Sequence, residues 1–140
     1  MSSRWIILED DAERRRRFGA CAEALGASIA FWHDAHAMIR EAPAALDDCV
    51  LISLDCDLIP PDGSEKWGDG ILVSEHLATL APVAPVIVHS TNRDGSRRMI
   101  ETLRAGGWSV IRVAPIGDDW IERDWRIEVD RIAGRRSSDC

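Results

Sequence analysis

The chain lacks any apolar run long enough to cross a membrane, and its four cysteines include no CxxC pair. A membrane-spanning helix needs about 20 consecutive apolar residues, so we expect no transmembrane segment. The N-terminal stretch, MSSRWIILEDD, turns acidic at once and does not resemble a secretory signal peptide. Scattered cysteines of this kind are typical of reduced thiols, which predicts a cytoplasmic protein.

Lysine is almost absent, since Lys66 is the only one, and the formal net charge is -7. An acidic surface argues against general DNA binding. It leaves a phosphate ligand open, because a metal ion can recruit phosphate to an acidic site. The length fits about one ordinary domain. We expect a single domain over residues 1–133 and a disordered tail over residues 134–140, GRRSSDC.

Short apolar runs bounded by polar turns recur along the chain and predict strands that are covered on both faces. The predicted strands are residues 5–8, 28–32, 50–54, 86–88 and 108–113. Helical spacing separates them, as in Phe18, Cys21, Ala22 and Leu25, with Gly26 as a stop. This alternation predicts a doubly wound α/β domain with a five-stranded parallel sheet in the order 2-1-3-4-5.

Acidic side chains follow two of the predicted strands. Glu9 and Asp10 come after the first strand, and Asp55 comes after the third. Ligands of doubly wound sheets bind beyond the carboxyl ends of the strands, where we expect these carboxylates to converge. Like charges this close must take up protons or bind a cation, and oxygen ligands suit Mg²⁺. The bland alternative is that Asp10 or Asp11 caps the following helix, which we expect of Asp11.

A second polar group, His89-Ser90-Thr91-Asn92, follows the fourth predicted strand. His89 can act as a general acid or base, and Ser90 and Asn92 can hydrogen-bond phosphoryl oxygens. Alternatively, this is a polar strand end whose side chains satisfy the next helix. Cys56 lies between two acids, which raise the pKa of a thiol and make it a poor nucleophile. The basic run Arg14 to Arg17 is expected to be a solvated helix face or a site for an acidic partner.

The strand ends resemble those of receiver domains from two-component response regulators. WIILEDD is similar to their first strand with its acidic pair, here Glu9 and Asp10. LISLDCDLIPPDG is similar to their third strand, and the resemblance places Asp55 at the phosphoacceptor position. RAGGWSVIRVAP is similar to their fifth strand, which ends at Pro115. Receivers carry a lysine just before that proline, whereas this chain has Ala114.

A second resemblance is to a receiver-like family proposed to process cyclic phosphates. That family shows an Asp-His-Asp-Leu segment, where this chain has Cys56 in place of the histidine, and a His-Ser-x-Asn segment, here His89, Ser90 and Asn92. The resemblance implies an enzyme or binder for a phosphate ester.

Two functions stay open at this point. The first is a Mg²⁺-dependent phosphoesterase or binder, acting on a phosphate-containing small molecule, a cyclic nucleotide phosphate or an RNA-end-like cyclic phosphate. It assigns catalysis to Asp55 and His89, and substrate binding to Ser90 and Asn92. The second is an atypical receiver that acts as a signalling module and binds a protein partner.

Overall fold

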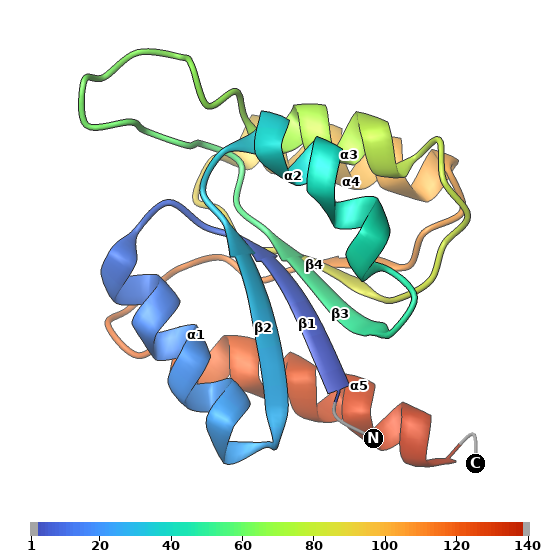
Figure 1. Cartoon of the computed structure of the whole chain (residues 1–140). Coiled ribbons are helices and arrows are strands. Elements are labelled where there is room, and N and C mark those ends of the chain that lie inside the picture. Colours follow the sequence, from blue (N-terminus) through green and yellow to red (C-terminus); the bar gives the residue numbers. More distant parts are fainter. Residues whose placement is uncertain (1–2, 139–140) are drawn as a thin grey trace.

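The computed structural model describes residues 3–138, which form one α/β domain with a central sheet (Figure 1). The strands are β1 (Ser3–Leu8), β2 (Ala27–Trp32), β3 (Cys49–Leu54), β4 (Val86–Val88) and β5 (Val110–Arg112). All neighbouring strands are parallel, and their order is β2-β1-β3-β4-β5. The predicted fold class and strand order are confirmed.

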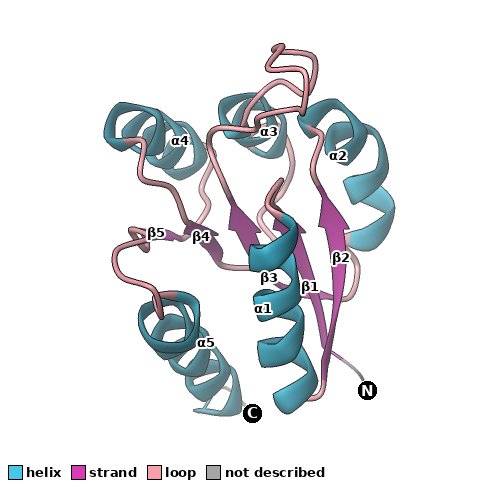
Figure 2. Cartoon of the chain, turned by 90° about the vertical axis from the view of Figure 1, so that its left-hand side faces the viewer, coloured by secondary structure: helices cyan, strands magenta, loops and turns pink. Residues whose placement is uncertain are grey.

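Helices cover both faces of the sheet (Figure 2). The α-helices are α1 (Ala12–Ala24), α2 (Ala35–Glu41), α3 (Gly70–Leu77), α4 (Arg93–Ala105) and α5 (Arg126–Ser138). A 3-10 turn, η1 (Ala42–Ala45), follows α2, and a π-helical turn, η2 (Ile121–Trp125), leads into α5. Helices α1 and α5 lie on one face, and α2, α3 and α4 lie on the other.

The core is divided into two layers by the alternation of side chains along the strands. Ile6 and Leu8 belong to the layer under α2, α3 and α4. Trp5 and Ile7 belong to the layer against α1 and α5, which is centred on Trp125. Since each strand is buried on both sides, the sequence shows continuous apolar runs instead of alternation.

Several predicted boundaries shift in the structure. Asp11 caps α1 as predicted, because its carboxylate accepts from the backbone N–H of Arg14 at 2.9 Å. Leu25, predicted on the buried stripe of this helix, is instead 40% exposed, since α1 ends at Ala24. Helix α5 continues to Ser138 and so includes residues 134–138, which were predicted to form a disordered tail. The last residues of that predicted tail, 139–140, lie outside the described residues.

Candidate functional site

The carboxyl ends of three neighbouring strands place Glu9, Asp55 and His89 side by side. Each residue extends the parallel ladder one step beyond its strand. The N–H of Asp55 donates to the carbonyl of Leu8 at 3.1 Å, and the N–H of His89 donates to the carbonyl of Leu54 at 2.9 Å. Backbone hydrogen bonds therefore fix the spacing of the three side chains.

Glu9 is fully buried and is held by several donors. One carboxylate oxygen lies 3.0 Å from Nε2 of His89, and the other accepts from the N–H of Asp11 at 3.0 Å. Nη1 of Arg14 is 3.7 Å from the first oxygen. Burial by itself raises the pKa of Glu9, but its contacts with His89 and with the backbone N–H of Asp11 together outweigh burial, and the pKa falls to about 2. Glu9 is thus a permanent negative charge in this site.

The pKa of Asp55 is shifted in the opposite direction to that of Glu9. Its side chain is buried, and one oxygen accepts from the N–H of Cys56 at 2.8 Å. Burial raises the pKa of Asp55 to about 9, with further contributions from the negative charges of Glu9 and Asp10. Because the charge of Asp55 is not compensated by the protein, a cation bound beside it would be stabilised.

Together these side chains form a group of possible metal ligands. Glu9, Asp55 and His89 each offer one ligand atom, and these atoms all lie within 4.8 Å of one another. This group contains two of the three predicted metal ligands, Glu9 and Asp55. Its third member is the imidazole of His89 instead of Asp10.

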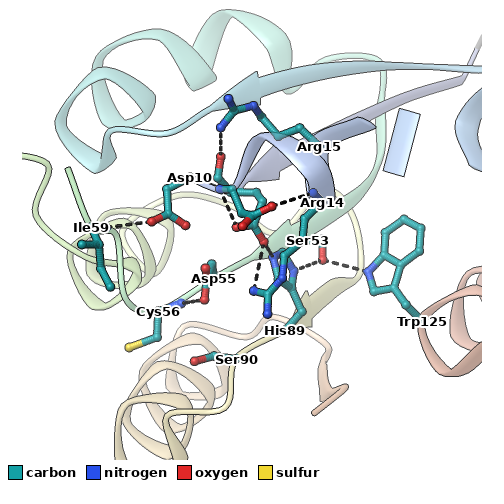
Figure 3. Close-up of polar contacts among 12 residues, drawn as sticks. Asp10, Arg14, Arg15, Ser53, Asp55, Cys56, Ile59, His89, Ser90 and Trp125 are labelled. Carbon is teal, nitrogen blue, oxygen red and sulfur yellow. Dashed lines mark hydrogen bonds and ion pairs between the residues drawn. The ribbon is translucent and has the colours of Figure 1, made fainter. Parts of the chain in front are cut away.

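Asp10 lies beside this group and has a different contact. One of its oxygens accepts from the N–H of Ile59 at 2.7 Å, which ties β1 to the loop after β3 (Figure 3). The carboxyl group is half-buried, and burial raises its pKa. Asp10 therefore anchors the loop and adds negative charge next to Glu9.

His89 is fully buried, and both of its ring nitrogens are occupied. Nε2 faces Glu9, and Nδ1 lies 2.6 Å from Oγ of Ser53. The indole Nε1–H of Trp125 donates to the same Ser53 oxygen at 3.0 Å. Figure 3 shows Ser53 between the ring of His89 and the indole of Trp125. A ring held in this way fits a fixed ligand or positioning group better than a group that exchanges protons with solvent.

The alternation of side chains along β4 explains on which face of the sheet the ring of His89 lies. Val86 and Val88 of β4 face one core layer, so Ile87 and His89 face the layer of α1 and α5. There the ring centroid of His89 lies 5.1 Å from that of Phe18. The ring centroid of Trp120 lies 5.8 Å from that of His89.

Ser90 and Asn92 serve the turn before α4. Oγ of Ser90 accepts from the N–H of Asn92 at 3.0 Å. The Asn92 side chain caps α4 by accepting from the N–H of Gly95 at 2.9 Å, and its amide donates to Asp57 at 3.2 Å. The alternative reading of a polar strand end that satisfies the next helix holds for Asn92. A role for either residue in substrate binding stays a prediction.

The basic run on α1 is not a simple solvated face. Arg14 approaches Glu9, and Arg15 donates to the backbone carbonyl of Glu9 at 3.0 Å. Arg17 pairs with Glu122 on η2 through two hydrogen bonds, whereas Arg16 pairs within α1 with Glu13. The expectation is wrong for Arg14, whose guanidinium borders the acidic group.

Sequence reasoning also missed Ser53 as part of the site. The available signal was its position, since Ser53 is the one interruption of an apolar strand. A hydroxyl in a strand buried on both faces needs a buried partner. The partners, His89 and Trp125, are far away in sequence and could not be read from the pattern.

Cys56 is buried and has a thiol pKa raised to about 12, first by burial and then by Asp57, Asp69 and Asp55. The prediction of a poor nucleophile agrees with this direction. Cys21, Cys49 and Cys56 are free thiols, and Cys140 lies outside the described residues.

A cavity of about 620 Å³ adjoins the site. It opens between α2, α3 and the loop after β3, and its wall includes His36, Asp57, Leu58, Ile59 and Leu72. Ile59 thus contributes to both the cavity and the Asp10 contact.

Comparison with solved structures shows which known fold the chain shares. The chain is similar to the signal receiver domain of an HD domain-containing protein from Pseudomonas fluorescens Pf-5, with a TM-score of 0.69 and 14% identity over 99% of both chains. The receiver domain of Francisella response regulator 1452 gives a TM-score of 0.69 at 19% identity, over 96% of this chain and 99% of that one.

The response regulator domain of Thermotoga maritima CheB gives a TM-score of 0.64 at 18% identity, over 96% of both chains. The fold is that of a receiver domain. No protein-family model matches the sequence, and no curated protein matches it either. The receiver-like domain has, among its described residues, no helix that is both long and apolar enough to span a membrane.

Proposed function

We propose that this receiver-like domain binds and hydrolyses a phosphate ester with the help of a divalent cation. The observation that carries the proposal is the convergence of Glu9, Asp55 and His89, whose ligand atoms lie within 4.8 Å of one another. Buried carboxylates that repel each other favour a bound cation.

The donor set fits a divalent cation. Glu9 is ionised, and the second oxygen of Asp55 receives no hydrogen bond from residues 3–134, whose side chains the structure describes. Mg²⁺, the cation expected from carboxylates alone, would polarise the phosphoryl group when bound. The protein itself contributes two fixed carboxylates and a site that is largely closed to water.

The lysine that receivers carry just before the proline that ends the fifth strand is missing here, because Ala114 precedes Pro115. Arg14 is the cation that borders the acidic group instead, with Nη1 3.7 Å from Glu9 and a side chain that is 31% exposed. The guanidinium is also held over the ring of Trp120 at 5.3 Å. A guanidinium in this place would bind phosphoryl oxygens and so compensate for the missing lysine.

Asp55 is the group that would react. Its free carboxylate oxygen would attack phosphorus, so that the new P–O bond forms as the ester P–O bond breaks and the leaving oxygen takes up a proton from water. Water then hydrolyses the acyl phosphate and restores the carboxylate. Cyclic phosphates are the substrates to test first, since the His89-Ser90-x-Asn92 segment resembles the family proposed to process them.

The experiment has two steps. Isothermal calorimetry first measures Mg²⁺ and Mn²⁺ binding to the wild type and to Asp55→Asn, and a hydrolysis screen over cyclic and linear phosphate esters follows. We expect cation binding and turnover in the wild type, and the loss of both in the variant. Asp57→Asn, which changes an exposed acid on the same loop, is the matched control. Equal turnover in the wild type and Asp55→Asn would contradict the proposal.

A second candidate is a signalling module that binds a protein partner without phosphorylation. A groove of about 350 Å³ between α4 and β5 favours it. The lining of the groove includes four arginines, Arg93, Arg97, Arg104 and Arg112, and two acids, Asp94 and Glu101. In a chain of net charge -7, this local excess of positive charge suits an acidic protein segment. Fluorescence anisotropy with an acidic peptide, compared between wild type and Arg97→Glu, tests it.

A further inference from the structure

The hydrogen bonds around His89 place a proton on Nε2, because the carboxylate of Glu9 beside it can only accept. An indole N–H can only donate, so Oγ of Ser53 accepts from Trp125. The hydroxyl hydrogen of Ser53 is then free to donate to Nδ1 of His89, at 2.6 Å. Nε2 carries the ring proton and donates it to the carboxylate of Glu9 at 3.0 Å. Every polar atom in this chain of contacts has a partner.

The imidazole of His89 adds a nitrogen ligand to the carboxylate oxygens of Glu9 and Asp55. Mg²⁺ is bound in proteins by oxygen ligands, whereas Mn²⁺, Fe²⁺ and Zn²⁺ accept imidazole nitrogen together with carboxylates. We infer that Nε2 of His89 is a metal ligand together with Glu9 and Asp55, and that the site prefers a divalent transition metal to Mg²⁺. This inference rests on the cation site of the proposed function and deepens it.

The spacing of the donors is compatible with one ion. Two ligands on opposite sides of a transition metal lie about 4.0–4.4 Å apart, twice a bond of about 2.0–2.2 Å. The ligand atoms of Glu9, Asp55 and His89 lie within 4.8 Å of one another, and Nε2 of His89 is 3.0 Å from the oxygen of Glu9, a separation that two adjacent ligands of one ion can have. Phe18 and Trp120 pack against the imidazole and prevent it from turning away.

Ser53 and Trp125 allow Nε2 of His89 to bind a metal while the ring keeps its one proton, now on Nδ1. When Nε2 binds metal, the ring proton must lie on Nδ1. Oγ of Ser53 has two lone pairs, so it can accept from Nδ1–H and from Trp125 at the same time while its own hydrogen turns away. Outer contacts of this kind orient metal-binding histidines in proteins. Ser53 and Trp125 are therefore positioning residues of the metal site.

The test compares metals on the wild type, His89→Asn and Asp57→Asn. Asparagine keeps a polar atom toward Ser53 and removes Nε2. By calorimetry we expect Mn²⁺ to bind the wild type at least about tenfold more tightly than Mg²⁺. This preference should disappear in His89→Asn and persist in Asp57→Asn. Equal Mn²⁺ and Mg²⁺ affinities in the wild type, or an unchanged preference in His89→Asn, would overturn the inference.

A measurement on the wild type avoids dependence on the folding of a core variant. Electron paramagnetic resonance of bound Mn²⁺ should show coupling to a ligand nitrogen, and its absence with Mn²⁺ bound would refute His89 ligation. In addition, the indole N–H signal of Trp125, assigned by its loss in Trp125→Phe, should shift with Zn²⁺ and remain still with Mg²⁺. If Mn²⁺ binds with nitrogen coupling but no ester is hydrolysed, the proposed function fails and the metal inference stands. If no cation binds, both fail.

Discussion

Replacing Asp55 by asparagine should stabilise the metal-free protein at neutral pH. The folded state raises the pKa of Asp55 from 3.8 to about 9, first because the carboxyl is buried and then because Glu9 and Asp10 are near. The folded state therefore binds a proton that the unfolded state has released, and stability falls as the pH rises from about 4 to about 9. Asparagine has no such proton to lose, and its carbonyl oxygen can still accept from Cys56.

The size of the effect follows from the pKa values. One unit of pKa corresponds to about 1.4 kcal/mol, so ionisation of unfolded Asp55 between pH 3.8 and pH 7 destabilises the fold by at most about 4 kcal/mol. Arg14 and water at the edge of the site reduce this value, and we expect a gain of about 2 kcal/mol or more in Asp55→Asn. Glu9, with its pKa lowered to about 2, changes stability only below about pH 4.5.

Urea unfolding in the presence of a chelator, followed by tryptophan fluorescence at pH 5 and pH 8, measures the difference. The gain in Asp55→Asn should increase with pH over this window, while Asp57→Asn should stay within about 0.5 kcal/mol of the wild type. A variant that is no more stable than the wild type at pH 7, or a gain that does not depend on pH, would refute the reasoning.

Three further predictions test other parts of the structure. Arg14→Gln should weaken phosphate-ester binding by about 10-fold or more, since a charge-assisted hydrogen bond contributes about 1.5–3 kcal/mol, while Arg16→Gln should have no effect in the same calorimetric titration. Acetyl phosphate should yield no long-lived phosphorylated form by intact mass, because Ala114 offers no ammonium group to an aspartyl phosphate; a persistent adduct would favour the signalling module. Gly70→Ala should destabilise the fold by about 2 kcal/mol or more in urea, since its Cβ would clash with the backbone carbonyl of Asp55, whereas Gly19→Ala, with open space around it, should be neutral or stabilising.

The fold could be predicted from the sequence because its strands are buried on both faces. That burial leaves short apolar runs such as Val86–Val88, and the alternation with helical stripes implies parallel pairing. The convergence of Glu9 and Asp55 followed from the strand order alone. These features depend on local pattern and on the topology that the pattern implies.

Side-chain direction at the site could not be predicted in the same way. The burial of His89 depends on Ser53 of the neighbouring strand β3 and on Trp125, which meets Ser53 only once η2 packs against the sheet. The contact of Asp10 depends on the conformation of a long loop. Arg14 was assigned to a solvated face because a basic run on a helix usually is one, and its partner Glu9 lies outside the helix.

The hydrogen bond from the amide of Ile59 to the carboxylate of Asp10 holds the loop after β3 near the end of β1. The same loop forms a wall of the 620 Å³ cavity through Ile59. A carboxylate has two oxygens, so a cation bound through the other oxygen of Asp10 would leave the contact with Ile59 in place and weaken it by drawing charge from the carboxylate. Cation binding at the end of the sheet would then act, through Asp10, on the loop that forms a wall of the cavity, and hydrogen exchange at the amide of Ile59 measures that effect.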